Sequence, residues 1–193
     1  MSYSKLKRGE SVAFKQGMTI ALIKPNDLND LIDMLNDDKV NTYLFFAPAD
    51  RSLYEGFFGP IIDDTQAAIE QGRWPDSPTF VIRTDEGDYM GMCAVTSVMF
   101  HDGNHEVGYQ LPVKAWGQGV ATQACRLMTE IGFNELGAHK ISADCYAGNV
   151  GSYKTLEKCG YKQEGRQVDY FKIDQGFDDK LYYGMTLVEY NAR

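Results

Sequence analysis

The chain has 193 residues, a net charge of −8 at pH 7 and four cysteines. A chain of this length can form one domain whose core needs neither a disulfide nor a metal for stability. Proteins that bind nucleic acids usually carry the opposite charge, so we expect no nucleic-acid partner.

The N-terminal stretch MSYSKLKRGE is polar and lacks the apolar segment of a secretory signal. No apolar run approaches the length of a membrane span, so we expect a soluble, cytoplasmic protein without a membrane partner. The cysteines are widely spread and form no Cys-x-x-Cys pair, which fits free thiols in a reducing compartment. We expect one domain over residues 1–193, with residues 1–12 as a loose arm.

The first part of the chain is expected to hold one strand and two helical regions. Met18–Ile23 is a short apolar strand, and Pro25-Asn26-Asp27 after it is typical of a helix start. Apolar residues then recur at helical spacing, at Leu28, Leu31, Ile32 and Leu35. A second helical region covers Arg51–Gln71, and three residues inside it predict two pieces joined at a kink: Gly56, Gly59 and Pro60.

The segment LFFAPAD, residues 44–50, lies between the two helical regions. Its large apolar side chains either belong to the core or form the wall of a substrate pocket. We expect Leu44, Phe45 and Phe46 in the core.

From Thr79 the apolar pattern changes to that of strands. Two turns, at residues 85–88 and 101–104, separate TFVIR, YMGMCAVTSVMF and HEVGYQL, which predicts a three-stranded antiparallel meander. A long helix is expected over Gly119–Leu136, a strand over Lys140–Tyr146 and a helix over Asn149–Cys159. The last two strands form a closing hairpin across Asp174–Asp179. This order predicts a mixed α/β sheet with helices on both faces.

The stretch WGQGVATQA, residues 116–124, places two glycines directly before the long helix. Main-chain N–H groups at such a helix start attract an anion, usually a phosphate, and glycine leaves the approach clear of side chains. The pattern is neither the Gly-x-x-x-x-Gly-Lys-Ser/Thr loop of ATP-binding proteins nor the Gly-x-Gly-x-x-Gly turn of dinucleotide-binding proteins. A simple tight turn remains the alternative interpretation.

Two segments together resemble a known family. LPVKAWGQGVATQA and NVGSYKTLEKCGYKQEG, about thirty residues apart, are similar to the GNAT superfamily of N-acetyltransferases. HEVGYQL and EGRQVDYFKIDQGFDDKLYYGMT resemble its RimJ/RimL branch, the ribosomal-protein N-terminal acetyltransferases. The resemblance covers Met18–Glu189 and is strongest from Glu106 onward. The superfamily often has Arg or Gln where this chain has Trp116, whose ring either covers an adenosine or, as we favour, packs.

The resemblance implies a GNAT-like fold with a mostly antiparallel central sheet flanked by helices. It also implies an enzyme that moves an acetyl group from acetyl-CoA to a primary amine, most readily a protein N-terminal α-amine, by direct transfer in a ternary complex. The alternatives are an acetyltransferase for a polyamine, amino acid or drug, and a non-catalytic acyl-CoA-binding module.

By the same resemblance, the pyrophosphate lies on main-chain N–H groups of residues 117–122 and the pantetheine follows residues 110–113. The residues expected to contact acetyl-CoA are Gln110, Leu111, Val113, Gly117, Gln118, Gly119, Val120, Ala121, Thr122, Asn149 and Ser152. Three lysines are candidates for the 3′-phosphate: Lys114, Lys154 and Lys158.

Acetyl transfer to an amine needs a proton donor for the departing thiolate and a base for the amine. The resemblance places Ser152 beside the cofactor sulfur, with Tyr153 as the adjacent alternative. Glu106 is the candidate base, because a carboxylate withdrawn from water has a raised pKa; Asp144 and a chain of water molecules are the alternatives. Main-chain N–H groups at the end of Val107–Leu111 are candidate donors to an oxyanion.

The three histidines, expected in turns, have no partners at metal-ligand spacing, so we predict no metal site. No histidine accompanies Cys125 or Cys145, which argues against a cysteine nucleophile. The aromatic closing hairpin leaves a homodimer open, although packing within the core explains the same residues.

Overall fold

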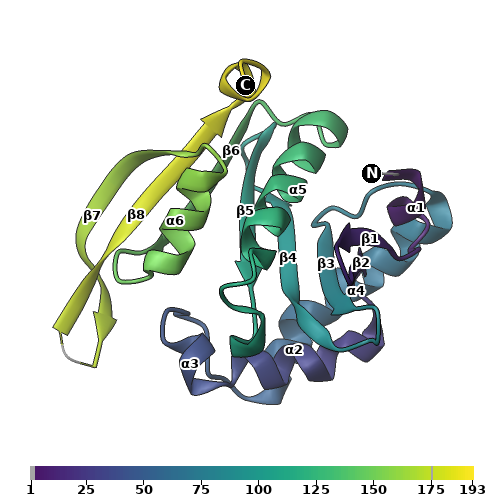
Figure 1. The fold of residues 1–193 in the computed structure, drawn as a ribbon, viewed down its shortest axis with the longest axis horizontal. Helices are drawn as coiled ribbons and strands as arrows, with labels where there is room; N and C mark the ends of the chain where they lie inside the picture. Colours follow the sequence, from purple (N-terminus) through teal and green to yellow (C-terminus); the bar gives the residue numbers. More distant parts are fainter. Residues whose placement is uncertain (1–2, 175) are drawn as a thin grey trace.

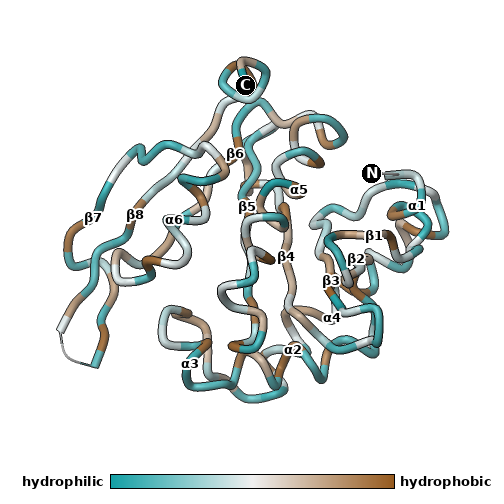
Figure 2. The backbone as a smooth tube through the Cα atoms, in the orientation of Figure 1, coloured by the Kyte–Doolittle hydropathy of each residue, from teal (hydrophilic) through white to brown (hydrophobic). Residues whose placement is uncertain are grey.

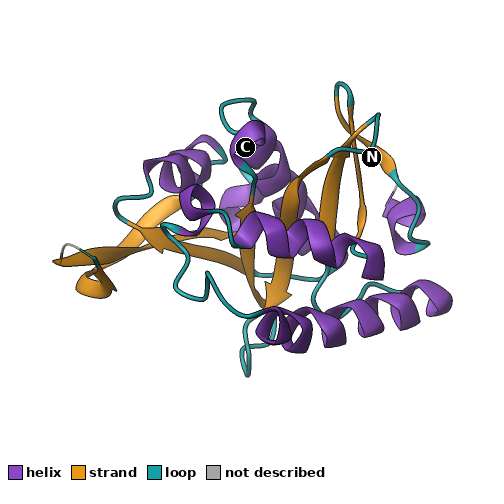
Figure 3. Ribbon diagram, turned by 90° about the horizontal axis from the view of Figure 1, so that it is seen from below, coloured by secondary structure: helices purple, strands orange, loops and turns teal. Residues whose placement is uncertain are grey.

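The structure, a computed structural model, describes residues 3–174 and 176–193 and shows a twisted sheet with helices on both faces (Figures 1 and 3). The strands are β1 Val12–Lys15, β2 Met18–Leu22, β3 Thr79–Thr84, β4 Tyr89–Ser97, β5 Asn104–Gln110, β6 Lys140–Tyr146, β7 Lys162–Ile173 and β8 Gly176–Thr186. The helices are α1 Tyr3–Lys7, α2 Leu28–Leu35, α3 Asp38–Asn41, α4 Arg51–Gln71, α5 Val120–Glu135, α6 Val150–Lys158 and α7 Leu187–Asn191. Two 3-10 turns are η1 Pro25–Asp27 and η2 Val113–Ala115.

The eight strands described form one sheet in the order β1-β2-β3-β4-β5-β6-β8-β7. Every neighbouring pair is antiparallel except β5 and β6, which are parallel. This arrangement confirms the predicted fold class and the meander of β3, β4 and β5. β7 lies at the edge and is largely hydrophilic (Figure 2), as an exposed edge strand requires.

Two apolar clusters cover opposite faces of the sheet because side chains alternate along each strand. The larger cluster packs α1, α5 and α6 on one face, where Phe80, Val107 and Ile141 point. The smaller cluster packs α2 and α4 against alternate residues of β3 and β4, such as Val81 and Met92. The second cluster contains no residue of β5, β6 or β8, so those strands lack a helical cover from it on that face.

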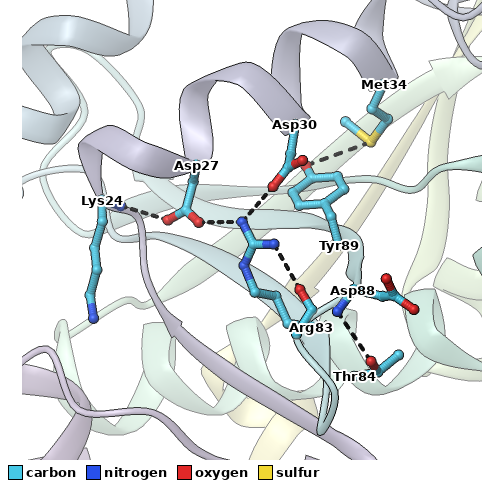
Figure 4. A network of polar contacts seen from close by, with 9 residues as sticks. Lys24, Asp27, Asp30, Met34, Arg83, Thr84, Asp88 and Tyr89 are labelled. Carbon is cyan, nitrogen blue, oxygen red and sulfur yellow. Dashed lines mark hydrogen bonds and ion pairs between the residues drawn. The ribbon is translucent and has the colours of Figure 1, made fainter.

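An ion-pair network fixes α2 to the sheet (Figure 4). Arg83 of β3 reaches carboxylate oxygens of Asp27 and Asp30, each at 2.6 Å. Asp27 also accepts a hydrogen bond of 2.8 Å from the N–H group of Lys24. The start of α2 is therefore held both by its own chain and by the neighbouring strand.

The N-terminal residues differ from the loose arm expected over residues 1–12. Residues 1 and 2 lie outside the described part, but α1 packs on the sheet with Leu6 fully buried. Val12–Lys15 then forms β1, which pairs with β2. The charged neighbours of Leu6 conceal this single apolar anchor in the sequence.

The prediction of two helical pieces over Arg51–Gln71 is wrong, because α4 is continuous through Pro60. One buried stripe runs along the helix on both sides of the proline: Tyr54, Phe58, Ile62, Thr65 and Ala68. Pro60 lies on the exposed side, and packing of the buried stripe outweighs the lost hydrogen bond. The closing hairpin also differs, because β8 begins at Gly176 and includes most of the expected turn; Gln175 lies outside the described residues.

Candidate active site

The separation of two neighbouring strands forms the centre of the candidate site. In the described sheet, β5 and β6 are joined by three residue pairs: Asn104↔Lys140, His105↔Ile141 and Glu106↔Ser142. β5 continues to Gln110 and β6 to Tyr146 without further pairing between them. Main-chain groups that a regular ladder would use therefore remain available along the inner sides of both strands.

A glycine-rich turn leads from the end of β5 toward α5. Gly117 and Gly119 have φ values of 71° and 73°, a left-handed conformation that glycine adopts without strain. A Cβ atom at either residue would meet no protein atom within 4 Å. Glycine is thus required by the backbone conformation, and the space beside the turn is open.

The N-terminus of α5 faces the same open space. The helix begins at Val120, and its N-cap residue Gly119 supplies no side-chain hydrogen bond. The first N–H groups of an α-helix have no partner within the helix, and the helix dipole adds positive potential there. This helix start therefore has the properties of an anion site.

A cavity of about 860 Å³ extends along the glycine turn, the end of β5 and the first half of α6. Nine predicted residues line it: Gln110, Leu111, Gly117, Gly119, Val120, Ala121, Thr122, Asn149 and Ser152. Trp116 also lines the cavity and is held by a hydrogen bond of 2.9 Å from its Nε1 to the carbonyl oxygen of Leu111. The structure thus brings two segments that are distant in the sequence to one cavity.

Three predicted residues do not line this cavity: Glu106, Val113 and Gln118. Val113 begins the 3-10 turn η2. The side-chain Nε2 of Gln118 donates back to the carbonyl oxygen of Lys114 at 2.6 Å. The main-chain carbonyl oxygen of Gln118 accepts a hydrogen bond from Nζ of Lys15 at 2.7 Å. The side chain and the main chain of Gln118 therefore both stabilise the turn.

Ser152 is held in place at the start of α6. The Asn149 side chain accepts a hydrogen bond of 3.1 Å from the Ser152 N–H group, the N-cap arrangement expected of asparagine. The Tyr109 hydroxyl donates to the Ser152 carbonyl oxygen at 3.0 Å and lies 3.4 Å from its Oγ. Burial raises the pKa of Tyr109 well above its usual range, which keeps this phenol protonated.

Tyr109 was not predicted as a site residue, although it lines the cavity. Its role depends on contact with a helix 43 residues further along the chain, which spacing in the sequence does not reveal. The alternative donor Tyr153 lies elsewhere. It packs against the larger core cluster, carries Nζ of Lys154 at 5.3 Å from its ring centre, and does not line the cavity.

Glu106 lies at the point where β5 and β6 separate, on the sheet face opposite α5 and α6. Although the residue is exposed, loss of surrounding water and, second, repulsion from Asp144 raise the pKa of its carboxyl group, while Lys180 opposes the rise. Asp144 is paired with Lys180, with 2.8 Å between Oδ2 and Nζ. This pairing leaves Glu106 as the carboxylate better placed to act as a base.

A further wall of the cavity comes from α3 and the loop after it, through Lys39, Val40, Thr42, Tyr43 and Leu44. Tyr43 contacts Tyr146 of β6, with 5.7 Å between ring centres. The expectation of core positions is wrong for Phe45, which is 79% exposed. Leu44 packs beside the smaller cluster and also lines the cavity, so both interpretations apply to it.

Of the three predicted phosphate-binding lysines, Lys154 and Lys158 line the cavity and Lys114 does not. Lys154 is paired with Glu157 at 2.7 Å. Lys158 also lines an adjoining cavity of about 550 Å³, together with Arg126 and Arg193. Lys158 is therefore shared by the two cavities, and the two arginines line the adjoining one.

The cysteines are free and buried. Burial raises the pKa of Cys145, close to the cavity, to about 11, so it remains a protonated thiol. His105 is buried within β5, which corrects its expected place in a turn. Among the described residues, no cluster of three or more His, Cys, Asp or Glu side chains has the arrangement of a metal site. No helix in residues 3–174 and 176–193 has the length and apolarity to cross a membrane.

Comparison with solved structures shows the same fold. Spermidine N-acetyltransferase from Vibrio cholerae, solved with CoA and spermine, matches with a TM-score of 0.77 and 18% identity, covering 92% of this chain and 99% of that one. Ribosomal-protein-S5-alanine acetyltransferase from Vibrio fischeri matches with a TM-score of 0.72 and 20% identity, over 91% and 96% of the two chains.

Comparison of sequences gives a consistent result. The putative ribosomal N-acetyltransferase YdaF of Bacillus subtilis is 26% identical over 182 residues, which are 91% of this chain and 94% of that protein. The family model of the acetyltransferase (GNAT) domain matches residues 18–162. Because this match covers more than half of the chain and includes the glycine turn and α6, the protein belongs to the GNAT acetyltransferase family.

Proposed function

We propose that the protein transfers an acetyl group from acetyl-CoA directly to the α-amine of a protein N-terminus. The observation that carries this proposal is the continuous arrangement of the glycine turn, the cavity and the gap between β5 and β6, with Ser152 and Glu106 beside the gap. Such an arrangement suits a long ligand with an anionic end and a reactive end.

The residues present fit the cofactor. The free N–H groups at the start of α5 suit a pyrophosphate, and the open space beside Gly117 and Gly119 leaves room for it. Unpaired main-chain groups along β5 suit the amides of pantetheine. Lys158, which lines both cavities, and Arg126, which lines the adjoining one, suit the 3′-phosphate. When bound, acetyl-CoA supplies an activated acetyl thioester.

The chain itself supplies the acid and base groups. Glu106 takes a proton from the incoming amine, directly or through water, and its raised pKa makes it a stronger base than an ordinary carboxylate. Ser152 donates a proton on the cofactor side, positioned by Tyr109 and Asn149. Main-chain N–H groups at the end of β5 are fixed donors to negative charge.

An N-terminal acceptor fits this modest catalytic apparatus. The pKa of an α-amine is about 8 and that of a lysine side chain about 10.4, so an α-amine loses its proton more readily. Similarity to proteins named as ribosomal N-acetyltransferases supports the same acceptor class. The free, buried cysteines suit work in the cytoplasm.

A thiol-release assay tests the proposal. The acceptors are peptides with a free N-terminus, the same peptides with a blocked N-terminus and an internal lysine, and small amines. We expect release of CoA thiol mainly with free N-termini. Activity confined to small amines would instead support the second candidate, a small-molecule acetyltransferase.

A non-catalytic acyl-CoA-binding module is the alternative from another functional class. The double variant Ser152→Ala with Glu106→Gln separates the two, because a binding module has no turnover to lose. We expect turnover to fall while CoA binding, measured by calorimetry, persists. Replacing acetyl-CoA with longer acyl-CoA substrates in the same assay then tests acetyl specificity.

A further inference from the structure

We propose that Lys180 limits the acceptor site to amines that carry a single positive charge near the reacting nitrogen. This inference rests on the proposed function and adds the charge class of its acceptor. It assigns a specificity-determining role to a side chain of β8 that lies outside the cofactor cavity.

Lys180 shares one open sheet face with the candidate base. Asp144 and Tyr146 alternate with Ala143 and Cys145 of the larger cluster, so they point away from α5 and α6. Lys180 is paired in register with Tyr146 and therefore points to the same side. Glu106 on β5 also lies on this side, which the smaller helical cluster does not cover.

Lys180 is a fixed cation and not a mobile surface lysine. Its side chain is only 16% exposed and its Nζ lies 2.8 Å from Oδ2 of Asp144. The same Nζ lies 5.0 Å from the ring centres of Tyr170 and Tyr182. Burial disfavours its charge, but the hydrogen bond and attraction of Asp144 prevail and raise the pKa of Lys180.

A bulge in β7 places Tyr170, one of the two tyrosines beside Lys180. Between Gln167 and Phe171 the register of β7 shifts against β8, which inserts extra residues that include Tyr170. The buried Asp179 holds the bulge by accepting the N–H group of Asp169 at 2.8 Å and by pairing with Arg166. The fold thus positions Tyr170 over Lys180 by a specific backbone device.

The charges on this face decide which acceptor fits. Glu106 and Asp144 would together form an attractive site for an acceptor with two ammonium groups. Lys180 neutralises Asp144 and leaves one uncompensated carboxylate, which favours one ammonium. A second ammonium would find no free carboxylate to pair with, because Asp144 is already paired with Lys180. A peptide α-amine followed by uncharged residues satisfies this condition, whereas a polyamine does not.

The test compares two peptide acceptors that differ only at the second residue, norleucine in one and lysine in the other. In Lys180→Met, which keeps an apolar stem without charge, we expect the kcat/KM preference for the norleucine peptide to fall about tenfold. Lys180→Arg retains the charge and should keep most of the preference. Asp144→Asn leaves Lys180 unpaired and should increase the preference.

Opposite shifts of the kcat/KM preference in Lys180→Met and Asp144→Asn cannot arise from general loss of folding, because unfolding would lower kcat/KM for both peptides alike. The pH profile gives a second readout, because Lys180 and Asp144 are the charged groups that act on Glu106. Lys180 lowers the pKa of Glu106, so its loss should move the acidic side of the kcat/KM profile to higher pH. An unchanged preference and an unchanged limb in active Lys180→Met would overturn this inference alone. Absence of transfer to every amine by the wild-type protein would overturn the proposed function and this inference together.

Discussion

Single residues decide the chemistry of the candidate site through their surroundings more than through their type. Glu106 and Asp144 are both carboxylates on the open sheet face, yet only Asp144 has a cation at hydrogen-bonding distance. Glu106 instead has its pKa raised by loss of water and by Asp144. The difference assigns distinct roles to two otherwise similar side chains.

The raised pKa of Glu106 predicts the pH dependence of the reaction. A base acts only when deprotonated, so kcat/KM should fall as pH drops through this pKa, at a higher pH than the usual value of about 4.3. Glu106→Gln should remove this limb and lower kcat/KM about a hundredfold. Glu86→Gln, in the exposed turn between β3 and β4, should leave the profile unchanged. An intact acidic limb in Glu106→Gln would assign the titration to another group.

The glycine turn allows a matched pair of substitutions at the two ends of α5. Gly119 before the helix and Gly137 after it have φ values of 73° and 70°, and a Cβ atom at either position would meet no protein atom within 4 Å. Alanine at either position should cost about 1 kcal/mol of unfolding free energy because of left-handed strain. Only Gly119→Ala should also weaken CoA binding in calorimetry. Equal effects of both variants on CoA binding would argue against the glycine turn as the phosphate site.

At the scale of secondary-structure elements, the network around Arg83 predicts how α2 is held. Arg83→Met leaves Asp27, whose side chain is 12% exposed, without its cation, and should lower the free energy of unfolding by about 1–3 kcal/mol. Arg8→Met removes an exposed pair with Glu10, away from α2, and should cost less than about 1 kcal/mol. Urea unfolding of both variants measures the difference, and similar values would contradict an anchoring role for Arg83.

Elements were predictable where local pattern and packing agree. Lys140–Tyr146 was predicted with its observed bounds, and α5 within a residue or so at each end, because apolar periodicity is strong in both. α1 and β1 were missed because Leu6 is surrounded by charged residues. α4 was predicted as broken because Pro60 is visible in the sequence, whereas the buried stripe that supports the helix acts only in the folded protein.

The candidate site also has one part that local sequence pattern predicts and one part that depends on tertiary contacts. The proposed cofactor side lies on two continuous segments whose residue types are distinctive, so their resemblance to the family predicted nine residues that line the cavity. The proposed acceptor side is assembled from α3, β6, β7 and β8. Tyr43, Tyr109 and Lys180 gain their places only through contacts with distant strands and helices, and no local pattern marks them.

At the scale of the whole molecule, a net charge of −8 opposes the approach of an anionic cofactor. We propose that binding depends on local cations, namely Lys158, which lines both cavities, and Arg126, which lines the adjoining one. Arg126→Gln with Lys158→Gln should weaken CoA binding about tenfold and leave dephospho-CoA binding nearly unchanged. Lys114→Gln, at a residue that lines neither cavity, is the control. If calorimetry shows that CoA and dephospho-CoA binding weaken equally, the 3′-phosphate lies elsewhere.

The parting of β5 from β6 gives this sheet a pair of edges in its interior as well as at its margins. Beyond Glu106 and Ser142, the inner sides of both strands offer peptide donors and acceptors that another strand would ordinarily engage. A narrow ligand that carries amide groups can pair with these two edges as an additional strand would. Strand edges that could otherwise pair with another protein chain then serve as a ligand-binding site.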